Sequence, residues 1–329
     1  MEYSAFVVKE ESDQSFTGQP TTLKCQDLPD GDVTIRVRYS SLNYKDALSF
    51  SGNKGVTRNY PHTPGIDAAG EVLSSADGSF VVGEKVLVVG YDLGMNTPGG
   101  FGEVIRVPKP WVMKLPPGLT LQSSMAWGTA GFTAALCVNK LIINGLSNEQ
   151  GPILVSGASG GVGSVAVMLL NKLGFEVHAL TTKPDQVEFF TALGAKKVLA
   201  LNDFLAQAKR PLLKPLYSGA IDVAGGEVLA TMLKCIQPSG SVACCGLVDS
   251  VSLNTTVLPF ILRGVNLLGV DSVELPIDVK RAMWTRMATD WSLPELEGRC
   301  QVISPDELGK SLQAILDGNA KGRFVLKQL

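Results

Sequence analysis

The residues best suited to chemistry form a glycine-rich stretch, Ser156 to Gly163, which reads S-G-A-S-G-G-V-G. It follows the apolar run 153–155, typical of a buried strand, and precedes residues 164–173, typical of a helix. Glycines let backbone N–H groups approach a pyrophosphate, and the positive N-terminus of a helix favours the phosphate charge. Glycine clusters also form ordinary turns, but the flanking strand and helix favour a dinucleotide site.

A second group of polar residues, Thr181, Thr182 and Lys183, follows the next expected strand, 175–180. An NAD site usually has an acidic residue about 20 residues beyond the glycines, where it binds the ribose 2′-OH. Two hydroxyls and an ammonium can instead hold a 2′-phosphate, so this segment predicts NADPH as the cofactor. Two alternatives stay open: Asp185 could be the ribose-binding acid, and Lys183 could be a solvated surface lysine.

Both groups are carried by a regular alternation of short strands and helices. The expected strands are 153–155, 175–180, 197–200, 220–224, 241–245 and 265–270. Helices are expected over 164–173, 185–193 and 227–236. Short apolar strands that alternate with helices predict a parallel sheet covered on both faces, in a doubly wound α/β domain.

The N-terminal part of the chain has a different, mainly β pattern. Residues 32–39 alternate between apolar and polar types, which predicts a half-buried antiparallel strand. A proline-rich stretch over 107–118 marks a boundary, and a helix over 125–141 begins the nucleotide domain. Further along, we expect a helix over 305–316 and a strand over 323–327 that returns to the first domain.

Charge and composition exclude several classes of protein. The chain has 29 basic and 31 acidic residues, so it lacks the electrostatic footprint of a protein that binds nucleic acid or an anionic membrane. No apolar run approaches the roughly 18 residues of a membrane span, and the N-terminus does not resemble a signal peptide. The six cysteines contain no C-x-x-C, which favours free thiols. We expect a cytoplasmic protein.

Four segments are more specific than these general patterns. They are Ser40–Ala47 (S-S-L-N-Y-K-D-A), Pro64–Gly70, Gly128–Ala134 and Pro259–Ser272. Over nearly its whole length the chain resembles the medium-chain dehydrogenase/reductase superfamily, and in particular the YhdH/YhfP quinone oxidoreductases, which include bacterial acrylyl-CoA reductases. The resemblance implies a GroES-like β-rich catalytic domain of residues 1–123 and 272–329. It also implies a Rossmann NADP-binding domain of residues 124–271.

The resemblance also implies contacts with the cofactor, position by position. The pyrophosphate would meet Ser159, Gly160, Gly161 and Val162, and the 2′-phosphate would meet Thr181 to Lys183. Further implied contacts are Tyr44, Leu247, Ile261 and Ser272. In one respect the chain departs from the pattern: related sequences often carry a basic residue after the third strand, where this chain reads L-A-L-N over 199–202.

Zinc-dependent relatives hold their metal with cysteine, histidine and acidic ligands, and the position of the catalytic cysteine corresponds to Asn43 here. The chain has only two histidines, His62 and His178, and its cysteines are not clustered. Tetrahedral zinc needs thiolate and imidazole ligands close together, so we expect no metal site. We expect His178 to be a core residue of its strand and His62 to be a loop residue.

Without zinc, the chemistry open to the site is hydride transfer to an activated C=C bond or a quinone. Hydride addition at the β-carbon forms an enolate, whose oxyanion needs positioned donors, and the α-carbon then takes a proton. The resemblance places Asn43 and Tyr44 beside the nicotinamide, where each could donate a hydrogen bond, and Asp67 could orient Asn43. Each residue also has a structural interpretation: an Asx-turn for Asn43, a domain-interface aromatic for Tyr44, and a purely structural carboxylate for Asp67.

The resemblance implies the reduction of acrylyl-CoA to propanoyl-CoA with NADPH. The alternatives are a quinone or enone reductase and a non-catalytic NADPH-binding protein. Lys54 and Arg58 are candidate partners for a CoA phosphate, although a solvated loop is the simpler interpretation. Homodimers of this superfamily commonly pair edge strands, and the apolar strand 265–270 would suit that role, so we expect a homodimer.

Overall fold

The computed structural model describes residues 1–328 and divides the chain into two compact units. Unit 1 consists of Met1–Thr129 and Val273–Leu329, and unit 2 consists of Ala130–Ser272. The boundaries implied by the resemblance, 123/124 and 271/272, differ from these.

Helix α2 (Leu121–Ile143) explains the first difference in the boundaries. Gly128 interrupts this helix with a φ of 51°. The residue after it, Thr129, donates its N–H to the carboxylate of Asp67 in unit 1, at 2.8 Å. The first turns of α2 are therefore tied to unit 1.

Unit 2 is built on a six-stranded sheet with the order β10-β9-β8-β11-β12-β13, in which every neighbouring pair is parallel. The strands are β8 (Ile153–Val155), β9 (Val177–Thr181), β10 (Lys197–Ala200), β11 (Tyr217–Asp222), β12 (Ile236–Cys244) and β13 (Asn266–Gly269). The predicted doubly wound parallel sheet is confirmed. The strand order reverses between β8 and β11, and such a switch point is where open α/β sheets bind nucleotides.

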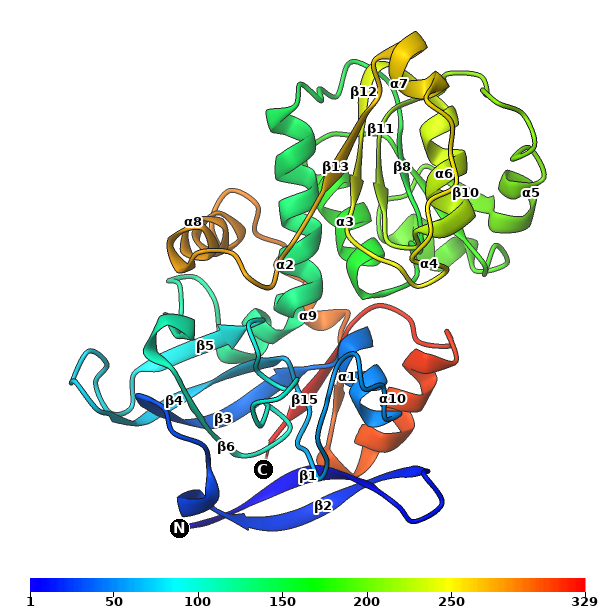
Figure 1. Cartoon of the computed structure of the whole chain (residues 1–329). Coiled ribbons are helices and arrows are strands. Elements are labelled where there is room, and N and C mark those ends of the chain that lie inside the picture. The colour runs from blue at the N-terminus through cyan, green and yellow to red at the C-terminus, as the bar shows by residue number, and fades with distance from the viewer. Residues whose placement is uncertain (329) are drawn as a thin grey trace. The chain divides into compact units, whose positions relative to one another are not determined.

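Helices lie on both sides of this sheet (Figure 1). They are α3 (Gly161–Lys172), α4 (Val187–Ala192), α5 (Leu201–Leu205), α6 (Gly226–Lys234) and α7 (Leu258–Arg263), together with most of α2. The inner strands are hydrophobic because helices cover both of their faces: Leu154, Leu180 and Val242 from three strands form one core with Val228 and Met232 of α6.

Unit 1 contains a seven-stranded sheet with the order β14-β15-β3-β4-β5-β7, in which β6 also pairs with β3, and a separate β1–β2 ribbon. The strands are β1 (Glu2–Glu10), β2 (Phe16–Lys24), β3 (Val33–Ser41), β4 (Asp67–Ser75), β5 (Lys85–Val89), β6 (Val104–Val107), β7 (Met113–Lys114), β14 (Gln301–Ile303) and β15 (Phe324–Lys327). Strand β15 pairs antiparallel with β3, with Val325 opposite Ser41. The late strand therefore returns to the first unit, as expected.

The helices of unit 1 are α1 (Tyr44–Phe50), α8 (Ile277–Ala288), α9 (Glu295–Gly298) and α10 (Leu308–Leu316). Helices α1 and α10 pack together over a core that includes Phe6, Leu42, Ala47, Leu312 and Leu326. The short helix α1 is thus packed against residues from both the beginning and the end of the chain. This packing fixes the position of its first turn.

Helix α2 also bears on the question of a membrane. No uninterrupted apolar run of the sequence approaches a membrane span, yet an 18-residue window of α2 has a mean hydropathy of 1.3, and the helix is long enough for a span. In that window 67% of the residues are buried, and Gly128 interrupts the helix. Burial of this kind is typical of a core helix in a globular protein.

Candidate active site

The glycine-rich loop of unit 2 connects the end of β8 to α3. Gly157 has a φ of 54°, and a Cβ there would lie 2.4 Å from Cγ2 of Val223. A Cβ on Gly163 would lie 2.4 Å from the carbonyl oxygen of Gly157, so the loop and the helix can approach each other only with glycine at this position. Gly160 is the N-cap of α3, which leaves the first backbone N–H groups of the helix directed at the loop.

A buried carboxylate lies behind this loop. Asp222, the last residue of β11, accepts a hydrogen bond from Oγ of Ser156 at 2.8 Å and another from the N–H of Gly225 at 2.8 Å. Oγ of Ser156 in turn accepts the N–H of Val223 at 3.0 Å. Burial raises the pKa of Asp222, although these donors favour its ionised form. The first residue of the glycine loop is therefore tied to the neighbouring strand at the switch point.

Most of the residues expected to contact the cofactor lie at the carboxyl edge of the unit 2 sheet. Ser159 to Val162 follow β8, Thr181 to Lys183 end or follow β9, Leu247 follows β12 and Ser272 follows β13. Because the strands are parallel, the structure brings these segments to one edge of the sheet.

The three residues expected at a 2′-phosphate differ in their exposure. Thr181 is buried, and its hydroxyl accepts the N–H of Lys183 at 3.0 Å, which shapes the turn. Thr182 is exposed and Lys183 is half-buried. Ser272 is also buried, and its hydroxyl accepts a hydrogen bond from Oγ1 of Thr133 at 2.8 Å.

Ile261 lies at the other end of the sheet. It belongs to α7, which directly precedes β13, and it is 69% exposed. Arg263 of the same helix donates to the carbonyl of Ile236, the first residue of β12, at 3.3 Å. The amino edge of the sheet is therefore where α7 lies, and within unit 2 the structure does not bring Ile261 together with the glycine loop.

In unit 1, a buried polar cluster surrounds Asp67, the first residue of β4. Its carboxylate accepts hydrogen bonds from Nδ2 of Asn43 at 2.8 Å, from the N–H and hydroxyl of Thr129 at 2.8 and 2.5 Å, and from the hydroxyl of Ser41. Gly128 makes this approach possible, because a Cβ there would lie 2.7 Å from Oδ2 of Asp67. Asp67 thus fixes the amide plane of Asn43.

Asn43 also begins a helix. It is the N-cap of α1, and its N–H donates to Oδ2 of Asp46 at 2.8 Å, so the structural interpretation of Asn43 as a turn residue holds together with its contact to Asp67. Tyr44 is the first residue of α1 and is half-buried. The cluster and the helix therefore position Asn43 and Tyr44 together.

Two charged residues of this cluster were missed by the sequence analysis. Arg323 is fully buried and donates to the carbonyls of Ala126 and Leu42 at 3.0 and 3.1 Å. Its Nη2 has no hydrogen-bond partner among residues 1–328, and burial lowers the pKa of its guanidinium. Asp46 is also fully buried, and burial together with neighbouring Asp67 raises its pKa to about 7.

A signal for Asp46 was present in the sequence, because an acidic residue three positions after an N-cap asparagine is a capping pattern. No local signal marks Arg323, which reaches Asn43 across 280 residues of chain. Its contribution depends on the pairing of β15 with β3.

The two histidines occupy different environments. His178 is half-buried on β9, where Nε2 lies 3.0 Å from Oε1 of Glu176, so it is less enclosed than the expected core residue. His62 lies outside the main strands but is buried, and its Nε2 lies 3.0 Å from the carbonyl of Gly94. Burial lowers the pKa of His62.

The candidate CoA-phosphate residues lie in an exposed segment after α1. Nζ of Lys54 pairs with Oε2 of Glu10 at 2.6 Å and lies 4.7 Å from the ring centre of Tyr60. Its charge is thus already matched by a carboxylate, which favours the simpler interpretation of this segment as a solvated loop. Arg58 is exposed beside it.

Two protein families match the chain. The Alcohol dehydrogenase GroES-like domain matches residues 29–117, and the Zinc-binding dehydrogenase domain matches residues 161–289. The name of the second family implies a metal, but the side chains around Asp67 are an amide, hydroxyls and a guanidinium. Across residues 1–328, no three His, Cys, Asp or Glu side chains form a group that could hold a metal ion. These residues do not fit a zinc ion, and we derive no step through one.

Several relatives are similar over nearly the full length. The acrylyl-CoA reductase AcuI of Ruegeria pomeroyi is 41% identical over 325 residues, which cover 98% of each chain. The yhdH oxidoreductase from Salmonella enterica, solved in complex with NADP, has a TM-score of 0.95 and 40% identity over 99% of each chain. The yhfP protein of Bacillus subtilis, solved with NAD bound, has a TM-score of 0.95 and 41% identity over 99% of each chain.

The similarity to these relatives covers both units of the fold, so it includes the glycine loop of unit 2 and the Asp67 cluster of unit 1. The chain belongs to the medium-chain dehydrogenase/reductase superfamily and, within it, to the group that contains AcuI, YhdH and YhfP.

Proposed function

We propose that this protein is an NADPH-dependent reductase that transfers a hydride to the activated C=C bond of an enoyl thioester, with acrylyl-CoA as substrate and propanoyl-CoA as product. The observation that carries the proposal is the buried cluster of unit 1, in which Asp67 holds the amide of Asn43. Such a cluster fixes the first turn of α1, where the hydroxyl of Tyr44 can donate to an oxyanion, and it lacks the ligands that zinc needs to activate a carbonyl. The name and the 98% coverage of AcuI favour acrylyl-CoA.

When bound, NADPH supplies the hydride. Negative charge then develops on the thioester oxygen, and we assign the hydroxyl of Tyr44 as a donor to it. Nδ2 of Asn43 already donates to Asp67 and lies 3.3 Å from acceptors of Ser41 and Asp46, so we assign Asn43 the role of holding the turn that carries Tyr44. Asp67 is a positioning residue, because it acts through Asn43 by fixing the amide plane. The guanidinium of Arg323 lies 3.5 Å from Oδ1 of Asn43 and adds a positive charge to the cluster.

The substrate is tested by following NADPH consumption with acrylyl-CoA and, separately, with 1,4-benzoquinone, and by repeating both with NADH. Efficient turnover of acrylyl-CoA supports the proposal and makes quinone activity secondary. Turnover of the quinone alone points to a quinone or enone reductase. That function is consistent with the name of the putative quinone oxidoreductase YhfP, to which the chain is 43% identical over 307 residues. Binding of NADPH without turnover of either acceptor points to a non-catalytic protein.

The preference for NADPH is tested at Lys183, which together with exposed Thr182 follows β9. Replacing Lys183 with Glu puts a carboxylate where the 2′-phosphate would bind, so we expect the ratio of kcat/KM for NADPH over NADH to fall by about tenfold or more. Lys196→Glu, an exposed lysine beside β10, is the matched control. An unchanged ratio in Lys183→Glu would remove this residue from the cofactor site.

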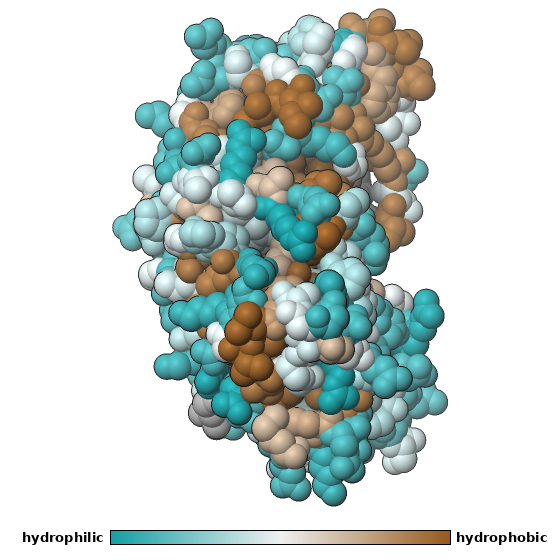
Figure 2. Space-filling view, turned by 90° about the vertical axis from the view of Figure 1, so that its left-hand side faces the viewer, coloured by the Kyte–Doolittle hydropathy of each residue, from teal (hydrophilic) through white to brown (hydrophobic). Residues whose placement is uncertain are grey.

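We further propose that the protein is a homodimer formed through β13. This strand is at one end of the sheet order, and the surface beside it carries large exposed side chains: Val257, Ile261, Leu262 and Leu267 are 64%, 69%, 63% and 37% exposed. Hydrophobic side chains are visible at the top of Figure 2, where Figure 1 places α7. An apolar sheet edge of this kind is usually covered, since it can otherwise pair with other chains.

A two-fold axis across β13 also bears on the cofactor contact expected of Ile261. Two copies of β13 paired antiparallel would bring the amino end of one strand beside the carboxyl end of the other. Ile261 of a second copy would then approach the edge that carries the glycine loop.

Light scattering at micromolar concentration tests the dimer, and a monomeric mass would refute it. We expect Leu267→Lys to yield monomers with weaker binding of NADPH.

We also propose a cytoplasmic location. The chain has a net charge of −2 and its longest apolar helix is mostly buried, which is consistent with a protein that meets a small-molecule substrate in solution. Fractionation of cells that express the chain tests this proposal, and recovery in the membrane pellet would contradict it.

A further inference from the structure

Unit 1 contains a cavity of about 590 Å³ that shares no lining residue with the Asp67 cluster. Its walls come from three places: the turn between β4 and β5, the segment over 109–117, and α8. The volume lies within the range of small-molecule sites. The cavity is therefore large enough for a ligand distinct from the substrate of the proposed reaction.

One face of α8 forms a wall of this cavity. Ile277, Arg281, Trp284 and Thr285 are spaced so that they lie on the same side of the helix, and all four line the cavity. Phe80 and Met113 contribute from the β-rich side. The remaining apolar lining residues are Pro110, Leu115, Pro116 and Pro117. This lining suits the apolar body of a ligand.

The charged side chains of the lining are all cationic. Lys109, Lys114 and Arg281 line the cavity, and no aspartate or glutamate does. An apolar site with cations and no carboxylate favours an anionic ligand. The planar guanidinium of Arg281 matches a carboxylate in particular, because its N–H groups can bond both oxygens at once.

Each of these cations is paired with a carboxylate outside the lining. Lys109 pairs with Asp77 at 2.5 Å, and Lys114 with Glu84 at 2.6 Å. Arg281 pairs with Asp278 at 2.8 Å. All three basic side chains are about half exposed or more, and exposed ion pairs contribute little to stability, so a bound anion can share or replace these partners.

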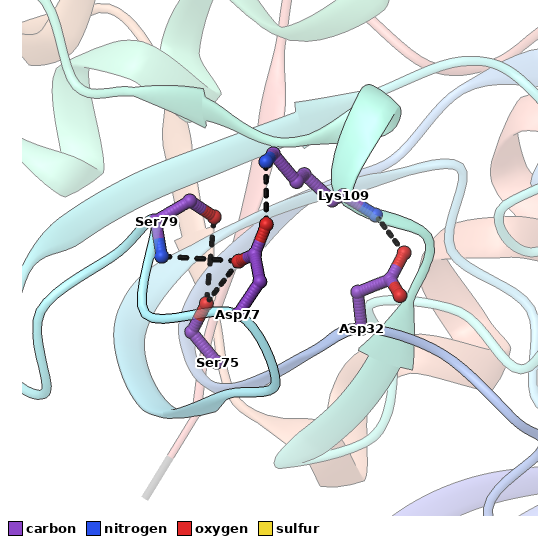
Figure 3. A network of polar contacts seen from close by, with 5 residues as sticks. All are labelled: Asp32, Ser75, Asp77, Ser79 and Lys109. Atoms are coloured by element: carbon purple, nitrogen blue, oxygen red, sulfur yellow. Dashed lines mark hydrogen bonds and ion pairs between the residues drawn. The ribbon is translucent and has the colours of Figure 1, made fainter.

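A polar network holds one wall of the cavity in place (Figure 3). Asp77 accepts the N–H of Ser79 at 3.0 Å and the hydroxyl of Ser75 at 3.3 Å, while its other oxygen holds Lys109. The N–H of Lys109 donates to Asp32 at 2.9 Å. The turn that carries Phe80 is thus fixed to the strand and the segment beside it, and a preformed wall loses less entropy when a ligand binds.

We propose that this cavity binds a hydrophobic carboxylate, such as a medium-chain fatty acid, with its chain against the half-buried Leu115 and Ile277 and its carboxylate on Arg281 and Lys114. The site goes beyond the proposed reductase function, since none of these residues belongs to the glycine loop or to the Asp67 cluster. Binding here is therefore a second property of unit 1, independent of the hydride acceptor.

Titration calorimetry of the full-length protein with decanoate, decyltrimethylammonium and butyrate tests this proposal. We expect decanoate to bind with one site per chain, and the cation of equal chain length and the short carboxylate to bind at least about tenfold more weakly. Equal binding of the decyl cation and decanoate, or no binding of decanoate, would overturn the proposal.

Variants locate the site. The double change Lys114→Gln and Arg281→Gln should weaken decanoate binding by about tenfold. The matched control, Lys209→Gln with Arg210→Gln, removes two exposed cations of unit 2 and should leave the binding unchanged. Leu115→Trp and Thr285→Trp fill the cavity from opposite walls and should each abolish binding. Retained reductase activity establishes that a variant is folded, and decanoate binding at full strength in all folded variants would place the ligand elsewhere.

Discussion

The glycine loop of unit 2 and the Asp67 cluster of unit 1 are both sites of tight local packing, but they are assembled in different ways. The loop is built from consecutive residues, and its conformation depends on small side chains at Gly157 and Gly163. The cluster draws Asn43, Asp67 and Arg323 from segments far apart in the chain. The loop requires glycine, because a Cβ at either position would clash with a neighbouring atom. The cluster requires buried charges and their hydrogen-bond partners.

The difference has an energetic consequence. A loop shaped by glycine fails when one methyl group is added, but the rest of the sheet stays intact. A buried network fails when one partner is removed, because the remaining donors and charges stay in a medium that cannot solvate them. We therefore expect changes in the cluster to affect both stability and turnover, and changes in the loop to affect mainly the affinity for NADPH.

The largest effect is expected for Asp67→Asn. The new amide would direct an N–H group at the donors of Asn43 and Thr129, so two hydrogen bonds are lost and Arg323 loses the neighbouring negative charge of Asp67. We expect kcat/KM to fall by about a hundredfold or more and stability to fall by about 3 kcal/mol. Steady-state kinetics and urea unfolding measure the two effects. Exposed Asp13→Asn is the control, and a fully active Asp67→Asn would contradict the assignment.

The next effect concerns the pH dependence of stability at Asp46. Its pKa of about 7 in the folded protein lies above the value of 3.8 expected for the unfolded chain. Its contribution to stability is therefore fully present below the lower value and is lost as the pH rises to about 7, by at most about 4 kcal/mol.

We expect the unfolding midpoint of the protein to fall between pH 4 and pH 7 more steeply than that of Asp46→Asn, which has no titrating group at this position. Urea unfolding at several pH values measures the two slopes. Equal slopes in the two proteins would show that Asp46 does not titrate in this range.

In the loop, Gly163→Ala sharpens the comparison. The added Cβ would meet the carbonyl of Gly157 at 2.4 Å and displace the loop from the helix. We expect NADPH to bind about a hundredfold more weakly, and the unfolding midpoint to change less than it does in Asp67→Asn. Gly298→Ala, where no atom lies within 4 Å of the new Cβ, is the control. Affinity that is unchanged in Gly163→Ala would mean that the loop does not bind the cofactor.

The smallest effect is expected for Ser156→Ala. This change removes the hydrogen bond to Asp222 and the acceptor for the N–H of Val223, but it leaves the glycines in place. We expect NADPH affinity to fall by a few-fold, corresponding to about 1 kcal/mol. Fluorescence titration with NADPH measures this affinity. A loss as large as that of Gly163→Ala would show that polar contacts, rather than glycines, set the shape of the loop.

The same contrast explains how much of the molecule could be predicted from its sequence. The parallel sheet and the glycine loop were predictable, because their signals lie within short runs such as 153–163. The segment Thr181 to Lys183 could be placed from its offset alone. Asn43 and Asp67 were proposed from a resemblance, but their contact depends on the pairing of strands β3 and β4, which no local pattern encodes.

The failures have the same physical origin. The ribbon of β1 and β2 was not identified, because the second strand, Phe16–Lys24, is half-exposed or exposed throughout and lacks a clear apolar face. Arg323 was not identified because a buried cation is recognisable only from its partners. The assignment of Ile261 to the cofactor stays a prediction, because the place of Ile261 at the amino edge follows from chain topology and the contact would need a second copy of the chain.

The late position of Arg323 in the chain has a consequence for biosynthesis. Unit 2 ends at Ser272, so during translation the nucleotide-binding sheet can complete its folding while residues 273–328 are still being made. The Asp67 cluster must wait for Arg323 and strand β15, and until then residues 39–41 of β3 lack their β15 partner. A nascent chain therefore acquires the capacity to hold a nucleotide before it acquires a finished reaction site, and premature termination in this last stretch would release a protein that sequesters cofactor without using it.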